Sequence, residues 1–240
     1  MNLCVDIGNT RVKTGLFRGK ELLEQNIWTA WTLPELIDYG NQAGVKNVLF
    51  STVAEPDPEM HEQLSAYFQA FELGTKTKLP FKNDYTTPET LGKDRLAAVA
   101  GAQALFPGEN CLVIDLGTCI KYDILTAAGV YLGGNIAPGA MMRIRAMHHF
   151  TARLPEVPME MPEHFTGSST TSALQNGALR GMALEVEGFV RLFEREHKAL
   201  RILLTGGDAN FFEPFLTISN NTNIPDLTLH GLNNILMYNT

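Results

Sequence analysis

One short motif occurs twice in this chain, each time between two apolar runs. Val5-Asp6-Ile7-Gly8-Asn9-Thr10 returns in altered form as Ile114-Asp115-Leu116-Gly117-Thr118. In both copies the aspartate ends an apolar run and the glycine permits a positive φ and close approach of a ligand, while the next Asn or Thr offers a side-chain hydrogen bond. A single turn of this kind is an ordinary hairpin. Two copies with matching flanks indicate a duplicated chain.

The chemistry of these turns favours phosphate binding. Successive backbone N–H groups form a small anion-binding nest, and an adjacent carboxylate can hold a magnesium ion. Two such turns facing a common cleft would hold a nucleoside triphosphate. The sequence has no Gly-x-Gly-x-x-Gly after its first strand and no Gly-x-x-x-x-Gly-Lys-Ser/Thr loop, so dinucleotide-binding and P-loop alternatives lose their main support.

Composition narrows the class of protein further. The chain has 240 residues, of which 45% are hydrophobic and 19% charged, as in an ordinary globular protein. Its net charge is −7 with scattered Lys and Arg, which argues against a nucleic-acid partner. No apolar run approaches the roughly 18 residues of a membrane span, and the N-terminus enters a strand directly. We expect a cytoplasmic protein without a membrane partner, whose three cysteines stay reduced.

Apolar periodicity predicts alternating strands and helices in both halves of the chain. Strands are expected at residues 3–5, 12–17, 47–51, 111–114, 120–125, 129–136 and 201–204. Helices are expected at residues 33–40, 58–71, 96–105 and 172–200. The turn residues Pro107-Gly108-Glu109-Asn110 then separate two domains, at residues 1–108 and 109–240.

Four further segments carry polar or glycine-rich patterns. In residues 85–95 a polar loop runs into an Ala-rich helix, where Asp94 is either the helix N-cap or a general base and Arg95 can hold a substrate carboxylate or phosphate. Residues 133–139 and 205–209 contain paired glycines that allow close approach of a ligand or another backbone, although a plain turn explains each equally well. Residues 168–172 are rich in hydroxyl groups, and the alternative to a functional role is that they only cap the long helix.

Taken in order, these motifs resemble type III pantothenate kinase, a family of the acetate and sugar kinase/actin-like superfamily. The resemblance spans almost the whole chain. It implies an α/β fold of duplicated actin-like (ribonuclease H-like) domains with a nucleotide cleft between them, and a homodimer. It also implies the ATP-dependent phosphorylation of pantothenate to 4'-phosphopantothenate, the first step of coenzyme A biosynthesis, with Mg2+ and a monovalent cation (K+ or NH4+).

The resemblance also assigns roles to individual residues. Asp94 matches the family's proton acceptor, Asp115 its monovalent-cation position, and Asp6 would orient magnesium through water. Thr170 matches a threonine that reaches pantothenate from the partner subunit. The ATP phosphates are placed on Asp6, Ile7, Gly8, Asn9, Thr10, Arg11, Val12, Lys13 and Thr118. The pantothenate contacts are placed on Tyr85, Gly92, Lys93, Asp94, Arg95 and Thr170.

One residue departs from the family pattern. Where members usually read Asp-x-Gly-Thr-Ala-x-Thr, this chain reads Asp115-Leu116-Gly117-Thr118-Cys119-Ile120-Lys121. Strand alternation puts Lys121 and Asp123 on one face. Lys121 therefore either forms a weak solvent-side ion pair with Asp123 or places its ammonium in the cation region. The departure concerns the cation assignment rather than the kinase assignment.

Two other functions remain open at this point. A sugar or short-acid kinase of the same fold would share the ATP turns and differ in the loop that contains Tyr85 and residues 92–95, because the fold alone does not fix the substrate. A non-catalytic nucleotide-binding regulatory protein would not need the aspartates Asp6, Asp94 and Asp115.

Overall fold

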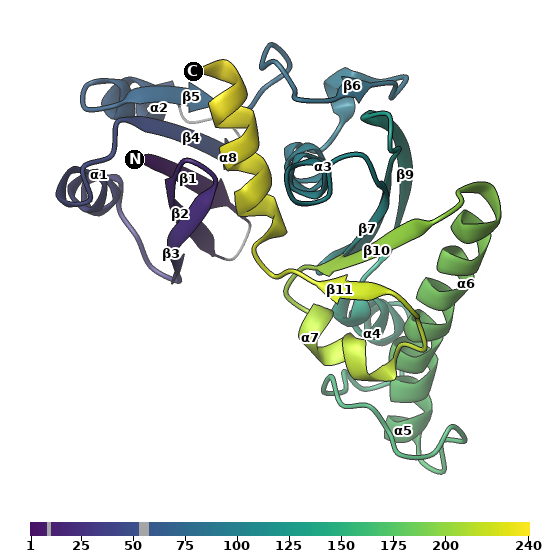
Figure 1. Cartoon of the computed structure of the whole chain (residues 1–240). Coiled ribbons are helices and arrows are strands. Elements are labelled where there is room, and N and C mark those ends of the chain that lie inside the picture. The colour runs from purple at the N-terminus through teal and green to yellow at the C-terminus, as the bar shows by residue number, and fades with distance from the viewer. Residues whose placement is uncertain (9–10, 53–57) are drawn as a thin grey trace. The chain divides into compact units, whose positions relative to one another are not determined.

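The computed structural model describes residues 1–8, 11–52 and 58–240 (Figure 1). Its first sheet has the strand order β3-β2-β1-β4-β5. In this sheet β1 pairs antiparallel with β2 and parallel with β4, and β4 pairs parallel with β5. The strands are β1 (Asn2–Ile7), β2 (Val12–Arg18), β3 (Glu21–Trp28), β4 (Asn47–Thr52) and β5 (Gln69–Glu72).

The second sheet repeats this topology. Its order is β11-β10-β7-β8-β9-β6, so that, read from β9, the series β9-β8-β7-β10-β11 corresponds to β3-β2-β1-β4-β5. The pairs β7–β10 and β10–β11 are parallel, as are β1–β4 and β4–β5. The duplication expected from the repeated motif is thus confirmed. The strands are β6 (Lys82–Asn83), β7 (Asn110–Leu116), β8 (Cys119–Leu125), β9 (Val130–Pro138), β10 (Leu200–Thr205) and β11 (Asn221–Asn223).

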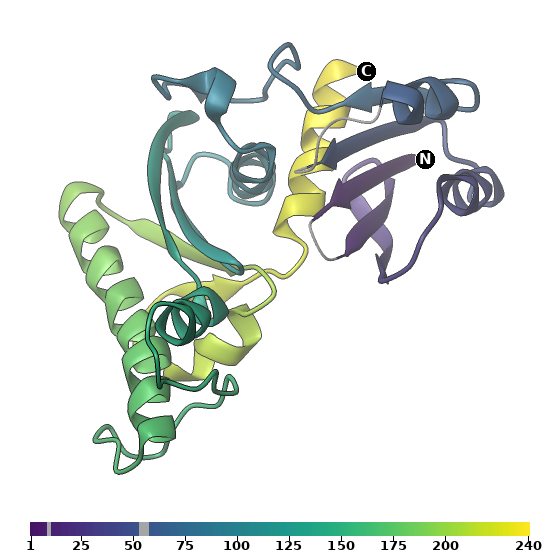
Figure 2. The ribbon, with the colours of Figure 1, turned by 180° about the vertical axis from the view of Figure 1, so that it is seen from behind.

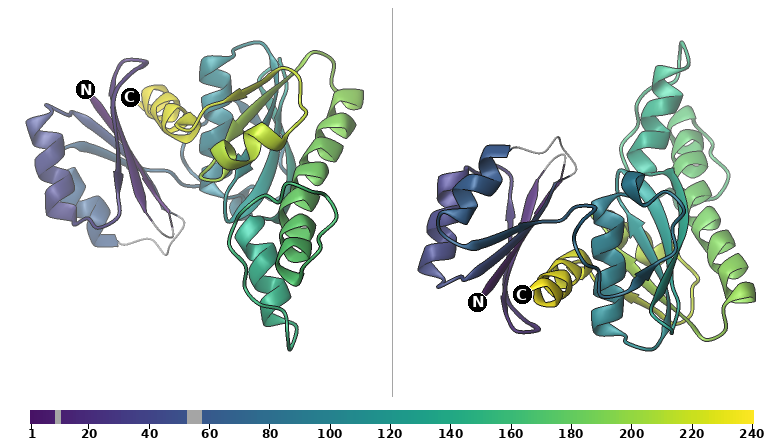
Figure 3. Two further views of the ribbon diagram at one scale, coloured as in Figure 1. Left: turned by 90° about the horizontal axis from the view of Figure 1, so that it is seen from below. Right: turned by 90° about the horizontal axis from the view of Figure 1, so that it is seen from above.

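One compact unit comprises residues 1–108, 125–133 and 226–240. Helices α1 and α2 cover one face of the first sheet, while α8 lies on the other face and packs against α3 (Figure 3). A Cβ on Gly101 would meet Leu227 O and one on Gly231 would meet Ala97 O, so glycines let α3 and α8 touch. The helices are α1 (Leu33–Gln42), α2 (Pro58–Ser65), η1 (Pro88–Thr90), α3 (Lys93–Leu105) and α8 (Leu227–Asn239).

The other compact unit comprises residues 109–124 and 134–225. Its core contains alternate residues of β7 and β8, from Leu112 to Leu116 and from Ile120 to Ile124, packed against helical residues such as Met182 and Phe212. Helix α6 runs alongside the strands (Figure 2). The helices are α4 (Ala140–His149), α5 (Thr170–Gln175), the π-helical η2 (Asn176–Arg180), α6 (Gly181–Glu196), α7 (Ala209–Phe212) and η3 (Glu213–Phe215).

Two expected helices differ from the structure. The helix expected at residues 58–71 ends at Ser65, and Gln69–Glu72 instead pairs with β4, where its backbone groups complete the sheet. The helix expected at residues 172–200 begins at Thr170, contains the π-helical turn and ends at Glu196. Leu200 begins β10, whose backbone pairs with β7.

The chain passes between the compact units at residues 108–109, 124–125, 133–134 and 225–226. The first of these positions coincides with the expected boundary, and the division into domains at residues 1–108 and 109–240 stays a prediction. None of the helices in the described part of the chain combines the length and apolarity that a membrane crossing requires.

Candidate active site

The first repeated turn joins β1 to β2. Asp6 is the Cα partner of Lys13 on β2 and of Ser51 on β4, which places it at the carboxyl end of a parallel strand pair. The Gly8 N–H donates to Arg11 O at 3.1 Å, and Gly8 and Arg11 are exposed. Of the predicted phosphate-binding residues, Asn9 and Thr10 lie outside the described residues.

The second repeated turn joins β7 to β8 and is held by two of the other motifs. The Gly139 N–H donates to Thr118 O at 3.1 Å, and the Asp208 N–H donates to Leu116 O at 2.9 Å. A Cβ on Gly139 would meet Gly117 O, and one on Gly206 would meet Leu116 O and Asp115 Oδ1. Gly206 has φ +96°. Gly139 of residues 133–139 and Gly206 of residues 205–209 therefore allow backbone to approach this turn.

Asp115 forms an ion pair within its own hairpin. The Lys121 Nζ lies 2.8 Å from Asp115 Oδ2, with side-chain exposures of 20% and 19%. Asp123 is 1% exposed, so it is not a solvent-side partner. The structure therefore supports the second of the two interpretations of Lys121, in which the ammonium reaches the region of Asp115.

The loop before α3 builds an aromatic and cationic cluster. The Arg95 guanidinium carbon lies 5.4 Å from the centroid of the Tyr85 ring, and Arg95 is only 3% exposed. Tyr85 stacks on Tyr131 with 6.2 Å between ring centroids and 15° between planes. A Cβ on Gly133 would lie 2.8 Å from the Tyr85 ring. Gly133 thus makes room for Tyr85, a contact that the glycine-rich motif alone did not specify.

Asp94 lies in the first turn of α3, but it is not the N-cap. The helix begins at Lys93 with Gly92 as its N-cap, and Asp94 Oδ1 accepts a hydrogen bond from the Arg95 N–H at 2.9 Å. The N-cap alternative is therefore wrong, while the placement of Asp94 and Arg95 at the helix start is confirmed. A carboxylate in this first turn is stabilised by the helix dipole.

Lys93 has a partner that the sequence did not indicate. Its Nζ lies 2.9 Å from Glu72 Oε1, with side-chain exposures of 25% and 29%. Glu72 ends β5, one residue beyond the segment 58–71 that the sequence assigned to a helix. No local spacing connects Glu72 with Lys93, because the two are 21 residues apart and meet only through the fold.

Thr170 is the first residue of α5. Ser169 is the N-cap, and its hydroxyl and that of Ser172 form a capping box. Ser169 rather than Thr170 therefore serves as the cap that this segment was expected to provide. Thr170 is exposed at the start of the helical run that continues through η2 into α6.

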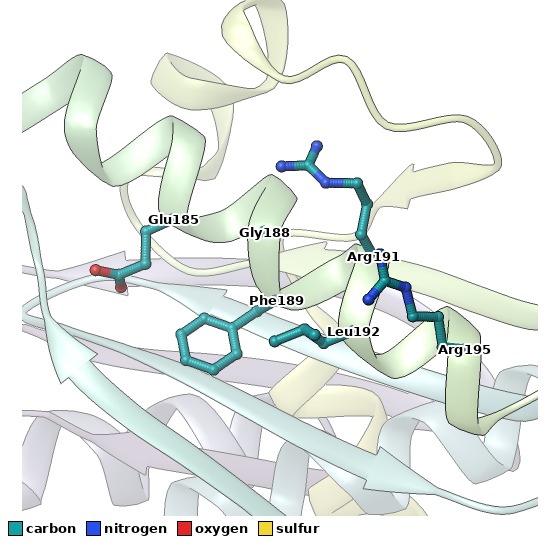
Figure 4. Close-up of a pocket in the computed structure, with 6 residues that line it drawn as sticks. All are labelled: Glu185, Gly188, Phe189, Arg191, Leu192 and Arg195. Carbon is teal, nitrogen blue, oxygen red and sulfur yellow. The ribbon is translucent and has the colours of Figure 1, made fainter.

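A shallow groove of about 400 Å3 lies along α6 and contains none of the predicted site residues. Its side chains come from successive turns of the helix (Figure 4). Glu185 at one end receives a hydrogen bond from Arg143 at 2.8 Å. Burial and the neighbouring Glu185 raise the pKa of the Tyr122 phenol, which stays protonated and donates to Glu185 at 3.5 Å.

The compact units divide the predicted site residues between them. Asp6, Tyr85 and residues 92–95 belong to one unit, and Asp115, Thr118 and Thr170 belong to the other. Within the described ranges, no three His, Cys, Asp or Glu side chains come close enough to hold a metal ion by themselves. Any cation held here would need ligands from backbone, water or substrate.

Comparison with known proteins supplies the family. The sequence model of the family Type III pantothenate kinase matches residues 2–192. A type III pantothenate kinase of Christiangramia forsetii is 38% identical over 241 residues, covering 100% of this chain and 99% of that protein. A type III pantothenate kinase of Cytophaga hutchinsonii is also 38% identical, with 100% of both chains covered.

Solved structures show the same fold at lower identity. A conserved putative Baf family transcriptional activator from Campylobacter jejuni has a TM-score of 0.63 at 22% identity, covering 99% of this chain and 98% of that one. The ROK hexokinase from Thermus thermophilus has a TM-score of 0.52 at 15% identity, covering 99% and 98%. These likenesses confirm the predicted α/β fold class with duplicated actin-like domains.

Proposed function

The chain belongs to the type III pantothenate kinase family, and we propose how its own residues carry out the family reaction. It phosphorylates pantothenate with ATP to give 4'-phosphopantothenate, the first step of coenzyme A biosynthesis. The observation that carries this conclusion is the match over the full length of named pantothenate kinases. The assignments of individual residues below are supported by their geometry.

We assign the ATP phosphates to the turn from Asp6 to Lys13 and to Thr118. The exposure of Gly8 and Arg11 leaves the described part of the first turn accessible. Asp6 offers a carboxylate at the end of β1, and oxygen ligands with retained water suit Mg2+. When bound, Mg2+ would neutralise phosphate charge during transfer. Asp6 and Lys13 would then fix the phosphates from opposite strands.

Asp94 is the proposed general base. Phosphoryl transfer depends on in-line positioning, on charge neutralisation and on a base that receives the hydroxyl proton. The Arg95 N–H donates to Asp94 Oδ1 at 2.9 Å. The same hydrogen bond restrains the orientation of the carboxylate that is proposed to accept the proton from the pantothenate hydroxyl.

The proposed pantothenate contacts are Tyr85, Gly92, Lys93, Arg95 and Thr170. The Arg95 guanidinium over the Tyr85 ring provides a rigid cationic wall suited to the pantothenate carboxylate. The ion pair with Glu72 restrains the ammonium of Lys93, the residue that precedes Asp94 in the chain. The N-cap Gly92 has no side chain to fill the space beside this helix start.

We further propose a cytoplasmic homodimer in which Thr170 reaches the partner subunit's pocket. Exposed leucines on α6 support an interface there, because Leu184 is 59% and Leu192 is 53% exposed. Thr170 begins the same helical run. The monovalent cation, K+ or NH4+, that the resemblance places at Asp115 stays a prediction, and Lys121 competes with it for the same carboxylate.

An ADP-release assay with pantothenate and a small panel of sugars and short acids tests the function. We expect ADP release from Mg-ATP with pantothenate and with none of the sugars or short acids. Turnover with a sugar or short acid instead would support the related-kinase alternative, because the substrate loop differs among enzymes of this fold. ATP binding without turnover of any of these compounds would support the regulatory alternative.

A further inference from the structure

The ion pair between Lys121 and Asp115 gives the second hairpin its own cation. Core residues alternate along β7 and β8, with Leu112, Ile114 and Leu116 on one strand and Ile120, Tyr122 and Ile124 on the other. Asp115 and Lys121 are the odd-numbered neighbours of these residues, so they share the opposite face of the sheet. Lys121 thus reaches Asp115 from the returning strand of the same hairpin.

The surroundings of Asp115 direct its two oxygens differently. Oδ1 lies against Gly206, whose φ of +96° and missing Cβ let the backbone approach. Thr205 is the Cα partner of Asp115 across the β10–β7 pair. The other oxygen, Oδ2, receives the Lys121 ammonium at 2.8 Å. The carboxylate is therefore enclosed on one side by backbone and neutralised on the other by a lysine.

The partial burial of this pair strengthens it. Both side chains are about one-fifth exposed, at 20% and 19%. Charges in such a setting interact more strongly than fully exposed pairs, because less water screens them. A free K+ or NH4+ that binds the same carboxylate has to displace a tethered ammonium of equal charge. Asp115 and its described neighbours therefore do not fit a separate monovalent cation.

We propose that the Lys121 ammonium permanently occupies the position of a monovalent cation at Asp115, which makes the enzyme independent of potassium. The proposal rests on the kinase function proposed above. Lys121 would supply the single positive charge beside the turn at Thr118, where ATP phosphates are proposed to bind, and would hold Asp115 in place. Its charge does not depend on the ionic composition of the medium.

The first test needs only the parent enzyme. Initial rates and thermal unfolding midpoints are measured against potassium concentration, with ionic strength held constant by choline chloride because screening alone changes rates. We expect both curves to be flat. A rate that rises steeply with potassium, together with a potassium-specific rise in the unfolding midpoint, would overturn the proposal.

The second test moves the charge. Lys121→Thr removes the ammonium and restores the residue usual in the family, and Lys121→Arg keeps a positive charge. Without potassium, Lys121→Thr should lose on the order of a hundredfold in rate, as when one electrostatic stabiliser is removed, and potassium should restore much of it. Lys121→Arg should remain insensitive to potassium. Potassium curves for parent and Lys121→Thr that superimpose would overturn the proposal.

A control variant and the unfolding midpoints distinguish failure of this proposal from failure of the kinase function. Lys198→Thr changes an exposed lysine of the same compact unit and should behave as the parent. If no form turns over pantothenate, the kinase function itself fails, and the unfolding midpoints still report potassium binding. A potassium-specific stabilisation of Lys121→Thr but not of the parent would support the lysine's role independently of turnover, while equal stabilisation of both would contradict it.

Discussion

The two copies of the Asp-x-Gly turn share a topology but differ in their surroundings. In the first copy, the one backbone hydrogen bond of Gly8 among the described residues goes to Arg11 O, across its own turn. Gly8 and Arg11 are both exposed. In the second, Gly139, Gly206 and Asp208 bring backbone against the turn. The described part of the first turn is thus exposed, whereas backbone packs against the second turn.

A lysine faces the aspartate in both hairpins. Lys13 is the Cα partner of Asp6, and Lys121 Nζ lies 2.8 Å from Asp115 Oδ2. The compact unit with the accessible turn also holds Asp94, Tyr85 and Arg95. We therefore expect Asp94→Asn in this unit to change chemistry, and Gly206→Ala beside the packed turn to change stability.

The largest expected effect is on chemistry in the first unit. Asp94→Asn keeps the shape and the oxygen that accepts the Arg95 N–H, but it cannot take the substrate proton. The rate should fall by roughly a hundredfold to ten-thousandfold, as expected for loss of a general base, with an unchanged unfolding midpoint. Asp38→Asn on the exposed face of α1 is the control. If Asp94→Asn kept more than about half the parent rate, Asp94 would not be the base.

The second prediction concerns packing around the second turn. Gly206→Ala introduces a Cβ against Leu116 O and Asp115 Oδ1 at a φ of +96°. It should lower the free energy of unfolding by about 2 kcal/mol or more, given the strain of such a backbone. Gly207→Ala meets no atom within 4 Å and should stay within about 0.5 kcal/mol of the parent. Denaturant titrations that give equal stabilities for the two variants would contradict the packed description.

A third, smaller effect tests whether Thr170 of one subunit contributes to the substrate pocket of the other subunit. Asp94→Asn and Thr170→Arg should each be inactive alone, and mixing them should restore part of the activity, because one pocket of a mixed dimer keeps both native side chains. Subunit exchange is confirmed by native mass spectrometry. Mixed dimers without recovered activity would mean that Thr170 does not serve the partner's pocket.

The smallest effect is on the acid stability of the first unit. The hydrogen bond from His230 lowers the pKa of Asp226, and Lys13 adds to this. A lowered folded-state pKa stabilises the protein above the unfolded carboxyl pKa of about 4 and loses this contribution as pH falls through the folded value. Asp226→Asn should cost less than about 1 kcal/mol at neutral pH.

The check on Asp226 is a pH series of unfolding free energies. The difference between parent and Asp226→Asn should shrink as the pH falls below about 5. Asp38→Asn, whose side chain is exposed on α1, provides the comparison for a carboxylate without such a contact. A difference for Asp226→Asn that stays constant down to acid unfolding would exclude a charge-dependent role for this carboxylate.

Local patterns predicted much of this molecule. The repeated motif located both hairpins, because alternating apolar residues and an Asp-x-Gly turn specify strand, turn and strand together. The sequence also predicted that Asp94 and Arg95 lie at the start of α3. By contrast, β11 (Asn221–Asn223) is a polar segment that becomes a strand only by pairing with β10. Helix α8 packs between the first sheet and α3 and buries residues around much of its circumference.

The site shows the same division between local and tertiary information. The roles of Asp94 and Thr170 came from motif resemblance, and the helix starts beside them follow from local residues. The contacts of Glu72 with Lys93 and of Gly133 with Tyr85 join distant segments, so no local spacing revealed them. Lys121 lay between two interpretations until the burial of Asp123 and the distance to Asp115 distinguished them.

The identity of the product tests the pantothenate kinase function directly. Purified protein is incubated with Mg-ATP and pantothenate, and the phosphorylated product is located by 31P NMR and tandem mass spectrometry. We expect a single product, 4'-phosphopantothenate, with the phosphoryl group on the primary hydroxyl. The parent and Asp38→Asn should form it at similar rates, and Asp94→Asn should form it far more slowly. Phosphorylation of the secondary hydroxyl, or equal product from Asp94→Asn and the parent, would contradict it.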